Sequence, residues 1–446
     1  MSFKAYEEFK DSNIDWIGPI PNYWQSYKLK HVINEFIAGG TPKSSNDAFW
    51  DENNNGIPWI AIGDMTDNDY VNSTVKSITR EGLADKNLRI LKKGTLIYSI
   101  FASLGKTAIL NIDATTNQAI LGLITSTKID VKYLKYYLEA LKGTISRFSN
   151  ENTQENLNSN IVKNMEIAMP ESLEEQKQIV NYLDKQTAKI DATIAKNKEL
   201  IELLEEKRVA LINQVVTKGL NPDVSMKYSG VEWIGKIPEH WNIMKLKHHG
   251  FVLGGYAFKS GDFTDSGVKV VKITNVQSLK FDWSECFYLP KSYLHEHSEF
   301  KINKGDIIFA LTRPIISTGI KAAIFDENEP ALANQRTGIF KKHSNDLIST
   351  FLYYVIYSDY FKEDFKSKIT ATNQPNISPL DIGEIKLILP SVEEQKQIVS
   401  KLDEETKKIS EVISKIKENI NLLEEYKTSL IHNVVTGKID VREEVI

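Results

Sequence analysis

Two segments of the chain carry apolar residues at alternating spacings of four and three, the pattern of a coiled-coil seam. The seam positions run from Leu183 to Val215 and again from Leu402 to Val434. Neither Pro nor Gly occurs in 174–217 or in 393–436. Each segment therefore predicts one helix of about 42 residues, roughly 60 Å long at 1.5 Å per residue. The residues expected to pair the helices are Leu183, Ile190, Ile194, Ile201, Leu204, Leu211, Leu402, Ile409, Ile413, Ile420, Leu423 and Leu430.

The segments that precede the two seams have a different pattern. Short apolar runs such as Gly56–Met65 and Gly267–Val276 predict buried strands. Tyr133–Leu141 and Phe351–Tyr360 predict amphipathic helices rich in aromatic residues. We therefore expect an α+β fold, in which two pseudo-repeated α/β domains are separated by two long antiparallel coiled-coil helices.

The chain is an internal duplication. DWIGPIPNYWQSYKLKH at 15–31 recurs as EWIGKIPEHWNIMKLKH at 232–248, displaced by 217 residues, and EEQKQIV at 174–180 recurs unchanged at 393–399, displaced by 219. Matches with a nearly constant displacement indicate two copies of a unit of about 220 residues. The expected globular domains are 1–170 and 222–390, and the expected helical segments are 171–221 and 391–446.

The apolar seams need a surface to pack against. The duplication favours antiparallel pairing of the two helices within one chain, because a duplicated chain can adopt an internal two-fold relation. Two alternatives remain open: each helix packs on its own globular domain, or the coiled coil forms between molecules. Long paired helices of this kind usually act as spacers, since they fix the distance and rotation between the domains at their ends.

Composition narrows the class of protein. With 55 basic and 59 acidic residues in 446, the net charge of −4 argues against a chain that coats nucleic acid by bulk positive charge, but not against local basic patches. The single Cys286 excludes an internal disulfide framework and a multi-cysteine metal site. No apolar stretch approaches roughly 18 residues, and the charged N-terminal segment does not resemble a secretory signal. We expect a cytoplasmic chain that spans no membrane and holds no metal or cofactor of its own.

Basic and amide side chains recur at matched places in the two copies. The pair Asn117-Gln118 reappears as Asn334-Gln335, displaced by 217. Arg, Asn and Gln read base edges through paired hydrogen bonds, whereas Lys contacts phosphates. The pair could equally be a turn that holds the fold. The candidate DNA-binding residues are Arg80, Arg89, Lys92, Lys93, Lys106, Asn117 and Gln118 in the first copy, and Lys304, Arg313, Lys321, Asn334, Gln335 and Arg336 in the second.

Two runs resemble catalytic motifs without completing them. GVEWIGKI fits most of a P-loop, but Ile237 stands where a magnesium-binding Ser or Thr is required, and Pro238 follows where a helix should begin. SPLDIGEIK places Asp381, Glu384 and Lys386 as in some nucleases, but the first copy lacks the aspartate. We expect neither run to be catalytic.

The clustered histidines do not complete a metal site either. His295 and His297 lie beside Glu296 and Glu299, which could hold a metal, but the first copy has no counterpart. The chain also contains no dinucleotide fingerprint, nucleophile elbow or H-E-x-x-H motif. The residues therefore offer no credible catalytic constellation.

The repeated motifs resemble those of a known family. WIG-x-IP-x-x-W at 16–24 and 233–241, EEQKQIV at the start of each helix, and the helix ends NQVVTKGL and HNVVTGKIDVRE resemble the specificity (S) subunit of type I restriction-modification systems. The resemblance covers nearly the whole chain. It implies two target-recognition domains, each reading half of a split DNA sequence, and two spacer helices that set the gap. It also implies that this subunit is not catalytic.

The resemblance further implies partners. Two copies of an adenine-N6 methyltransferase (M) subunit would dock on the helices at 174–217 and 393–436 and use S-adenosylmethionine. Translocase–nuclease (R) subunits would use ATP and Mg²⁺, and double-stranded DNA would be the target. Base contacts are not transferable, because recognition loops vary within the family. Two alternatives are a coiled-coil scaffold whose domains bind proteins, and a nuclease in its own right that depends on Asp381 and Glu384.

Overall fold

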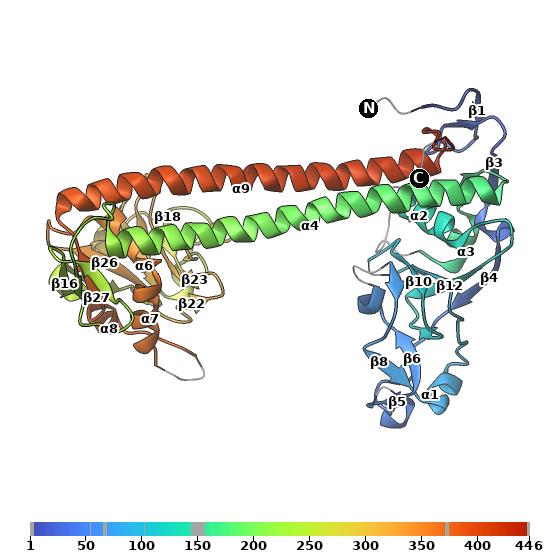
Figure 1. Ribbon diagram of the computed structural model, residues 1–446. Helices are drawn as coiled ribbons and strands as arrows, with labels where there is room; N and C mark the ends of the chain where they lie inside the picture. Colours follow the sequence, from blue (N-terminus) through green and yellow to red (C-terminus); the bar gives the residue numbers. More distant parts are fainter. Residues whose placement is uncertain are drawn as a thin grey trace. The chain divides into compact units, whose positions relative to one another are not determined.

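The computed structural model describes residues 4–53, 55–65, 69–101, 103–143, 157–370 and 374–443. The chain folds into two compact units (Figure 1). Unit 1 comprises Met1–Asn197 with Glu418–Ile446, and unit 2 comprises Lys198–Lys417. Each unit therefore contains one globular part and a portion of both long helices, whereas the sequence-based division treats each helix as a separate segment.

Unit 1 is built on two mixed sheets whose strands are short and mostly buried. Only β10–β7 and β11–β6 pair in parallel; the other pairs in these two sheets are antiparallel. One sheet has the order β4 (Ile33–Ala38), β12 (Ile120–Thr125), β9 (Leu96–Ser99), β10 (Thr107–Leu110), β7 (Tyr70–Val71). The other has the order β11 (Thr115–Thr116), β6 (Ile57–Ile60), β8 (Lys76–Ile78), β5 (Trp50–Asp51).

The remaining elements of unit 1 surround these sheets. Strand β1 (Phe9–Asp11) pairs with β2 (Pro19–Pro21), and β3 (Gln25–Lys28) pairs with β13 (Glu166–Met169), both antiparallel. The short helices are α1 (Arg80–Asp85), α2 (Val131–Leu141) and α3 (Ser159–Asn164). Helix α2 begins where Asp130 accepts hydrogen bonds from the main-chain N–H groups of Lys132 and Tyr133, which satisfies donors that a helix start leaves unpaired.

Unit 2 has the same arrangement of two main sheets, but the strands at the edges of the sheets differ. Its two main sheets have the orders β17 (Gly250–Gly254), β26 (Thr337–Lys342), β21 (Ile307–Ala310), β24 (Ala322–Ile324), and β19 (Tyr288–Leu289), β18 (Val268–Val271), β25 (Ala331–Ala333), β20 (Lys301–Ile302). The paired strands outside them are β14 (Met226–Tyr228) with β15 (Lys236–Pro238), β16 (Asn242–Lys245) with β27 (Lys386–Leu389), and β22 (Ile315–Ile316) with β23 (Gly319–Ile320). The short helices are α5 (Tyr293–Glu296), α6 (Ser349–Ile356), α7 (Asp359–Ser367) and α8 (Pro379–Gly383).

Three local predictions need correction. The strand expected over Gly267–Val276 is limited to β18, which ends at Val271. The helix expected over Phe351–Tyr360 is two helices, because the chain turns at Tyr357 and the Ser358 side chain caps the start of α7 by accepting from the main-chain N–H of Phe361. The strand expected over Gly56–Met65 ends at Ile60, and a 3₁₀ helix follows. Apolar runs alone do not distinguish a buried strand from a buried turn of helix.

The long helices are α4 (Leu173–Lys218) and α9 (Val392–Val435). In unit 1 the Lys427 ammonium lies 2.7 Å from the Asp191 carboxylate. In unit 2 Arg208 lies opposite Ser410, with Nη2 at 3.4 Å from Oγ. A displacement of 219 relates Arg208 to Lys427 and Asp191 to Ser410, so both units pair the helices at equivalent positions.

The seam residues lie toward the buried side of both helices. Leu183, Ile190, Ile194, Leu402, Ile409, Ile413, Ile420 and Leu430 are buried, and Ile201, Leu204, Leu211 and Leu423 are partly buried. The expected α+β fold, with two repeated domains and two long antiparallel helices, is confirmed. The first part of each helix also packs on its own globular domain. This packing, one of the alternatives left open by the sequence, therefore occurs together with the pairing of the two helices.

The repeated tryptophan motif anchors each domain to its long helix. Trp24 is fully buried, and its indole N–H donates to Glu175 at 3.1 Å. Trp241 donates to Glu394 at the same distance. Both glutamates belong to the EEQKQIV repeat at the start of a helix, and Glu175 also accepts from the hydroxyls of Tyr6 and Tyr23. The two strongest repeats in the sequence are therefore two sides of one contact.

A buried glutamine completes this junction in each unit. Gln395 is fully buried; its amide oxygen accepts from the Ile348 N–H at 2.9 Å, and its amide nitrogen donates to the carbonyls of Asp346 and Pro390. Gln176 makes the equivalent bonds to Asp130, Lys128 and Pro170. One side chain thus fixes the main chain on both sides of the junction between domain and helix.

A tyrosine from the domain also docks on each helix. The Tyr136 hydroxyl donates to Asp184 at 2.7 Å, and the Tyr354 hydroxyl donates to Asp403 at 2.6 Å. Both hydroxyls also approach a seam threonine, Thr187 in unit 1 and Thr406 in unit 2. These contacts fix the rotation of each domain about its helix.

We predict that Gln395→Ala destabilises unit 2, because the main-chain groups it contacts would stay buried without partners. The expected loss is about 2–5 kcal/mol of unfolding free energy, measured by urea denaturation of the full chain followed by circular dichroism. Gln397→Ala is the matched control, since Gln397 is exposed two residues further along the same helix. Equal effects of the two substitutions would contradict this account.

Candidate nucleic-acid interface

The matched Asn-Gln pairs occupy equivalent positions in the two units, directly after a strand. We call each pair, together with the glycine that packs against it, the Asn-Gln corner. In unit 1 the Asn117 N–H donates to the Ile60 carbonyl at 2.9 Å, directly after β11. In unit 2 the Asn334 N–H donates to the Val271 carbonyl at 3.0 Å, directly after β25. The main chain of each pair therefore continues a sheet, which is the fold-holding role that the sequence left open.

A glycine makes each corner possible. A Cβ atom on Gly39 would lie 2.1 Å from the Asn117 carbonyl oxygen, and one on Gly255 would lie 2.2 Å from the Asn334 carbonyl oxygen. No side chain fits at such distances, so the strand that leads into each Gly-Gly run can approach the Asn-Gln pair only through glycine. This contact joins two segments that are far apart in sequence.

The side chains at the two corners differ in whether they form hydrogen bonds within the protein. Gln118 is exposed, and its amide oxygen accepts from the Thr41 hydroxyl. Gln335 and Arg336 are exposed, and no hydrogen bond found in the described part of unit 2 uses either side chain. Amide and guanidinium groups left free at a surface can form paired hydrogen bonds with base edges. Thr41 was not identified from sequence, and no motif marks it.

In unit 1 part of the basic cluster adjoins this corner. The side chains of Lys86 and Leu88 lie within 4 Å of a Cβ placed on Gly40. Arg89, next in the chain, forms an ion pair with Glu35 at 2.5 Å. Exposed ion pairs of this kind contribute little to stability and can exchange partners.

Other unit 1 candidates lie around the same segment. Lys92 pairs with Asp113 at 2.7 Å, and hydrogen bonds from the Lys92 side chain and the Lys93 main chain lower the pKa of Asp113. Lys93 is exposed. Arg80 lies apart, at the exposed start of α1. Their roles in DNA binding stay predictions.

The unit 2 candidates are more dispersed. The main-chain carbonyl of Arg336 accepts a hydrogen bond from the Leu311 N–H. Exposed Arg313 follows Leu311 by two residues, so Arg313 lies near Arg336. Lys304 pairs with Asp326 at 3.3 Å in a turn after β20. The structure therefore gathers Gln335, Arg336 and Arg313, and leaves Lys304 elsewhere.

Lys321 does not reach the surface. Its side chain is buried, its ammonium donates to the Ile273 carbonyl at 2.5 Å, and burial lowers its pKa. Lys106 is its structural counterpart, since Ser99 bonds to the Lys106 carbonyl as Ala310 bonds to the Lys321 carbonyl. Lys106 is only partly buried. The Lys321 ammonium is therefore occupied within the fold, which does not favour its predicted role in DNA binding.

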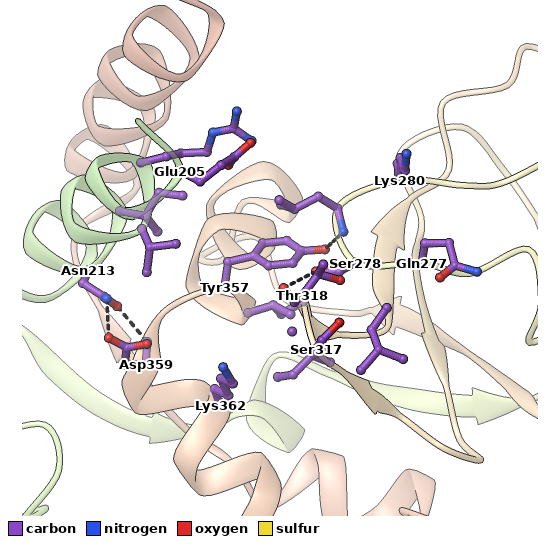
Figure 2. Close-up of a pocket in the computed structure, with 18 of the residues that line it drawn as sticks. Glu205, Asn213, Gln277, Ser278, Lys280, Ser317, Thr318, Tyr357, Asp359 and Lys362 are labelled. Atoms are coloured by element: carbon purple, nitrogen blue, oxygen red, sulfur yellow. Dashed lines mark hydrogen bonds and ion pairs between the residues drawn. The ribbon is translucent and has the colours of Figure 1, made fainter. Parts of the chain in front are cut away.

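A cleft lies where the domain of unit 2 meets α4 (Figure 2). Its volume is about 1120 Å³. Asn213 on α4 donates to the Asp359 carboxylate at 2.5 Å and accepts from the Asp359 N–H, which closes one end. Tyr357 lies beside the turn that contains Ser278 (Figure 2). A smaller cleft in unit 1, of about 620 Å³, is lined by charged residues that include Lys106, Asp191 and Lys427.

The turn beside Tyr357 is strained. Leu279 has φ of 69°, a conformation unfavourable for a large side chain. The Tyr357 hydroxyl accepts from the Leu279 N–H at 2.6 Å, and the Tyr353 hydroxyl donates to its carbonyl at 2.9 Å. Two tyrosines thus hold a conformation that the turn alone would not keep.

The motif-like runs have structural roles. Asp381 accepts from the Ser378 hydroxyl at the start of α8. Glu384 pairs with Lys245 and Lys247 at 2.5 and 2.6 Å, and these two hydrogen bonds lower its pKa to about 2. The lysine of the P-loop-like run, Lys236, begins β15.

Two further features bear on the kind of protein. His297 packs among aromatic rings, with its ring centre 4.3 Å from that of Tyr256. Within the described residues, no group of three or more His, Cys, Asp or Glu side chains is placed to hold a metal ion. None of the helices in the described part of the chain combines the length and the apolar character that crossing a bilayer requires.

Known proteins match the duplicated unit over one or both copies. A family model for the type I restriction modification DNA specificity domain matches residues 21–203 and again 238–422. The type I restriction enzyme MjaVIII specificity subunit of Methanocaldococcus jannaschii is 31% identical over 446 residues, covering 99% of this chain and 98% of its own. The EcoAI specificity subunit of Escherichia coli is 28% identical over 207 residues, 46% of this chain and 35% of its own.

Solved structures share the fold. A chain from a study of complex assembly and conformational transition of the type I R-M system superposes with a TM-score of 0.71 at 14% identity, covering 93% of this chain and 98% of that one. The HsdS subunit from Thermoanaerobacter tengcongensis gives a TM-score of 0.52, also at 14% identity, covering 94% and 98%.

The two family matches are displaced by 217 residues at their starts and 219 at their ends, the displacements of the repeated motifs. Each match therefore covers one copy of the duplicated unit, from the tryptophan anchor into the long helix. The relatives are specificity subunits, which supports a non-catalytic role. The chain belongs to the family of type I restriction-modification DNA specificity subunits.

Proposed function

We propose that this subunit reads a bipartite DNA target, with one half-site for each unit. The observation that supports the proposal is the repetition of the Gly–Asn-Gln corner, which presents exposed Gln118 in one unit and exposed Gln335 in the other. The corners share their main-chain geometry and differ in their side chains. That combination suits two readers of different half-sites.

The long helices are proposed to set the gap between half-sites. Helix α4 has 46 residues and α9 has 44, and each continues without a break from one unit into the other. Half-sites on one face of B-DNA recur about every 34 Å. A helix of this length, roughly 69 Å at 1.5 Å per residue, is long enough for such a spacing.

Two copies of an M subunit are the proposed partners of the helices. Leu203 is 53% exposed and Leu422 is 58% exposed, and they occupy equivalent positions, displaced by 219. Leu200 and Tyr426 are also exposed near them. Apolar side chains exposed at the same place in both repeats suit a partner that binds twice. S-adenosylmethionine would be held by those subunits, and ATP and Mg²⁺ by R subunits.

The net charge of −4 is consistent with phosphate contacts made mainly by partner subunits. A chain with no excess of basic residues neutralises few phosphates and binds DNA weakly alone. In the proposed complex, much of the phosphate contact comes from the partner subunits, while this chain supplies the base contacts and the spacing.

A methylation map tests the function directly. DNA from cells that carry this gene with its M partner should show adenine methylation in two short defined sequences separated by a fixed gap. DNA from cells that lack the gene should not. Methylation of an uninterrupted motif, or no difference between the two maps, would refute the proposal.

Lengthening the helices should widen the gap. Inserting seven residues after Asn197 and seven after Lys417 preserves the seam, because seven is the heptad period. The added length, about 10 Å, should widen the mapped gap by about three base pairs and leave both half-sites unchanged. An insertion in only one helix is the control, since it disrupts pairing. Changed bases in both half-sites would argue against a spacer.

Replacing exposed Leu203 and Leu422 with a charged residue should prevent binding of the M subunits. We expect Leu203→Glu to remove one M copy and the double variant with Leu422→Glu to remove both, weakening each site about tenfold or more. Native mass spectrometry of the assembled complex counts the copies. Lys198→Gln with Lys417→Gln is the control, at equivalent exposed positions elsewhere on the helices. Full assembly by the double variant would exclude this docking surface.

A further inference from the structure

Unit 2 carries an aromatic cluster beside its Asn-Gln corner that the function so far does not use. The ring centre of Tyr256 lies 4.3 Å from that of His297, 5.1 Å from that of Phe258 and 5.3 Å from that of Phe300. Tyr293 lies 5.3 Å from His297 on the other side. The run GGYAF, in which an aromatic residue follows the paired glycines, is the sequence signal for this cluster.

Tyr256 is the member of the cluster that remains accessible. Its side chain is 41% exposed, whereas Phe258, Tyr293, His297 and Phe300 are partly buried. Among the hydrogen bonds of the described residues, none uses the Tyr256 hydroxyl. The ring is therefore held by neighbouring rings and still presents surface to a ligand.

The exposed ring adjoins the candidate base-reading residues. The Tyr256 N–H donates to the Ala333 carbonyl at 2.9 Å, and Tyr256 forms a parallel bridge with Asn334. Gln335 and Arg336 follow at once. An aromatic surface, an amide and a guanidinium thus meet at one corner of unit 2.

The fold of the corner does not require the aromatic ring. Gly40 takes this position in unit 1, where its N–H donates to the Thr116 carbonyl at 2.8 Å, the counterpart of the bond from Tyr256 to Ala333. Unit 1 therefore forms the same corner without a side chain. Tyr256 is an addition specific to unit 2.

The chemistry of the cluster suits the face of a nucleobase. In a paired duplex the faces of the bases are covered by their neighbours, and side chains reach only the edges in the grooves. Exposed aromatic rings instead stack on bases that have left the helical stack. A surface with Tyr256 and His297 beside Gln335 therefore fits an unstacked base better than a paired one.

Adenine methylation makes it easier for such a base to form. A methyltransferase must extrude the target adenine into its own pocket, which leaves the opposite base unpaired and lowers the cost of its leaving the stack. We propose that Tyr256, supported by His297, stacks on the base left opposite the extruded adenine in the half-site read by unit 2. This inference rests on the proposed function, and it makes Tyr256 a positioning residue for only one of the two half-sites.

The test uses the complex of the full chain with its M subunits. After exchange of the unit 2 domain has assigned its half-site, duplexes are premethylated so that only the adenine of that half-site accepts a methyl group. Tyr256→Ala should weaken duplex binding and slow methylation about 5- to 150-fold, the value of one stacked base. Tyr256→Phe should match the wild type, and Tyr228→Ala should have no effect, because Tyr228 is 79% exposed elsewhere in unit 2.

A second duplex isolates stacking. With an abasic site opposite the target adenine there is no base to stack on, so the wild type and Tyr256→Ala should bind equally. Tyr256→Leu keeps apolar bulk without an aromatic face and should behave as Tyr256→Ala does. The proposal is overturned if Tyr256→Ala binds the normal duplex as the wild type does, if its deficit persists on the abasic duplex, or if Tyr256→Leu restores binding.

The same experiment separates this inference from the function on which it rests. Failure of the wild-type complex to methylate any gapped target would overturn the proposed function and the stacking together. Normal methylation by the wild type, with no deficit in Tyr256→Ala, would overturn the stacking alone. Unchanged methylation of the unit 1 half-site by Tyr256→Ala is expected, and equal loss at both half-sites would contradict the assignment to unit 2.

Discussion

The junction between each domain and its helix depends on one buried amide. Gln176 in unit 1 and Gln395 in unit 2 are fully buried and bond to the main chain on both sides of the junction. A buried amide is costly unless its donors and acceptor are satisfied. The geometry that satisfies them also fixes where the domain leaves the helix. Each Asn-Gln corner belongs to a domain that is attached to its helix through this contact.

In the rest of each unit, main-chain contacts hold the fold, and exposed side chains can differ between the two copies. Main-chain bonds and a glycine build the corner. The side chains of Gln335 and Arg336 take no part in holding it, whereas Gln118 also accepts from the Thr41 hydroxyl. In the proposed function, replacing Gln335 or Arg336 changes what is read without changing the sheet beneath. The strained Leu279 turn follows the same logic, because tyrosine hydroxyls hold its main chain and leave its exposed neighbours free to differ.

Much of the fold was predictable from sequence, because the seam and the duplication are periodic signals that survive divergence. The long helices and the repeated α/β domains follow from them. The site was predictable only in part. Gln335 and Arg336 are exposed as expected, but Lys321 is buried, because its burial depends on Ile273, 48 positions away. Nothing local to Lys321 distinguishes it from Lys106, which stays accessible. Tyr256 was missed because one aromatic residue after two glycines has no period and no motif.

The glycine corners also limit which segments of a domain can be exchanged. Each corner joins a glycine near the start of the domain to an Asn-Gln pair almost eighty residues later, as with Gly39 and Asn117. Any segment exchanged into either domain must carry glycine at this position, because another residue would place a side chain where only a hydrogen atom fits. Exchange of a whole domain keeps the glycine and its Asn-Gln partner together. The identical EEQKQIV segments, which carry the anchoring glutamate and glutamine, supply the same attachment at both sites. Exchange of whole domains would therefore leave both the corner contact and the attachment to the helix intact.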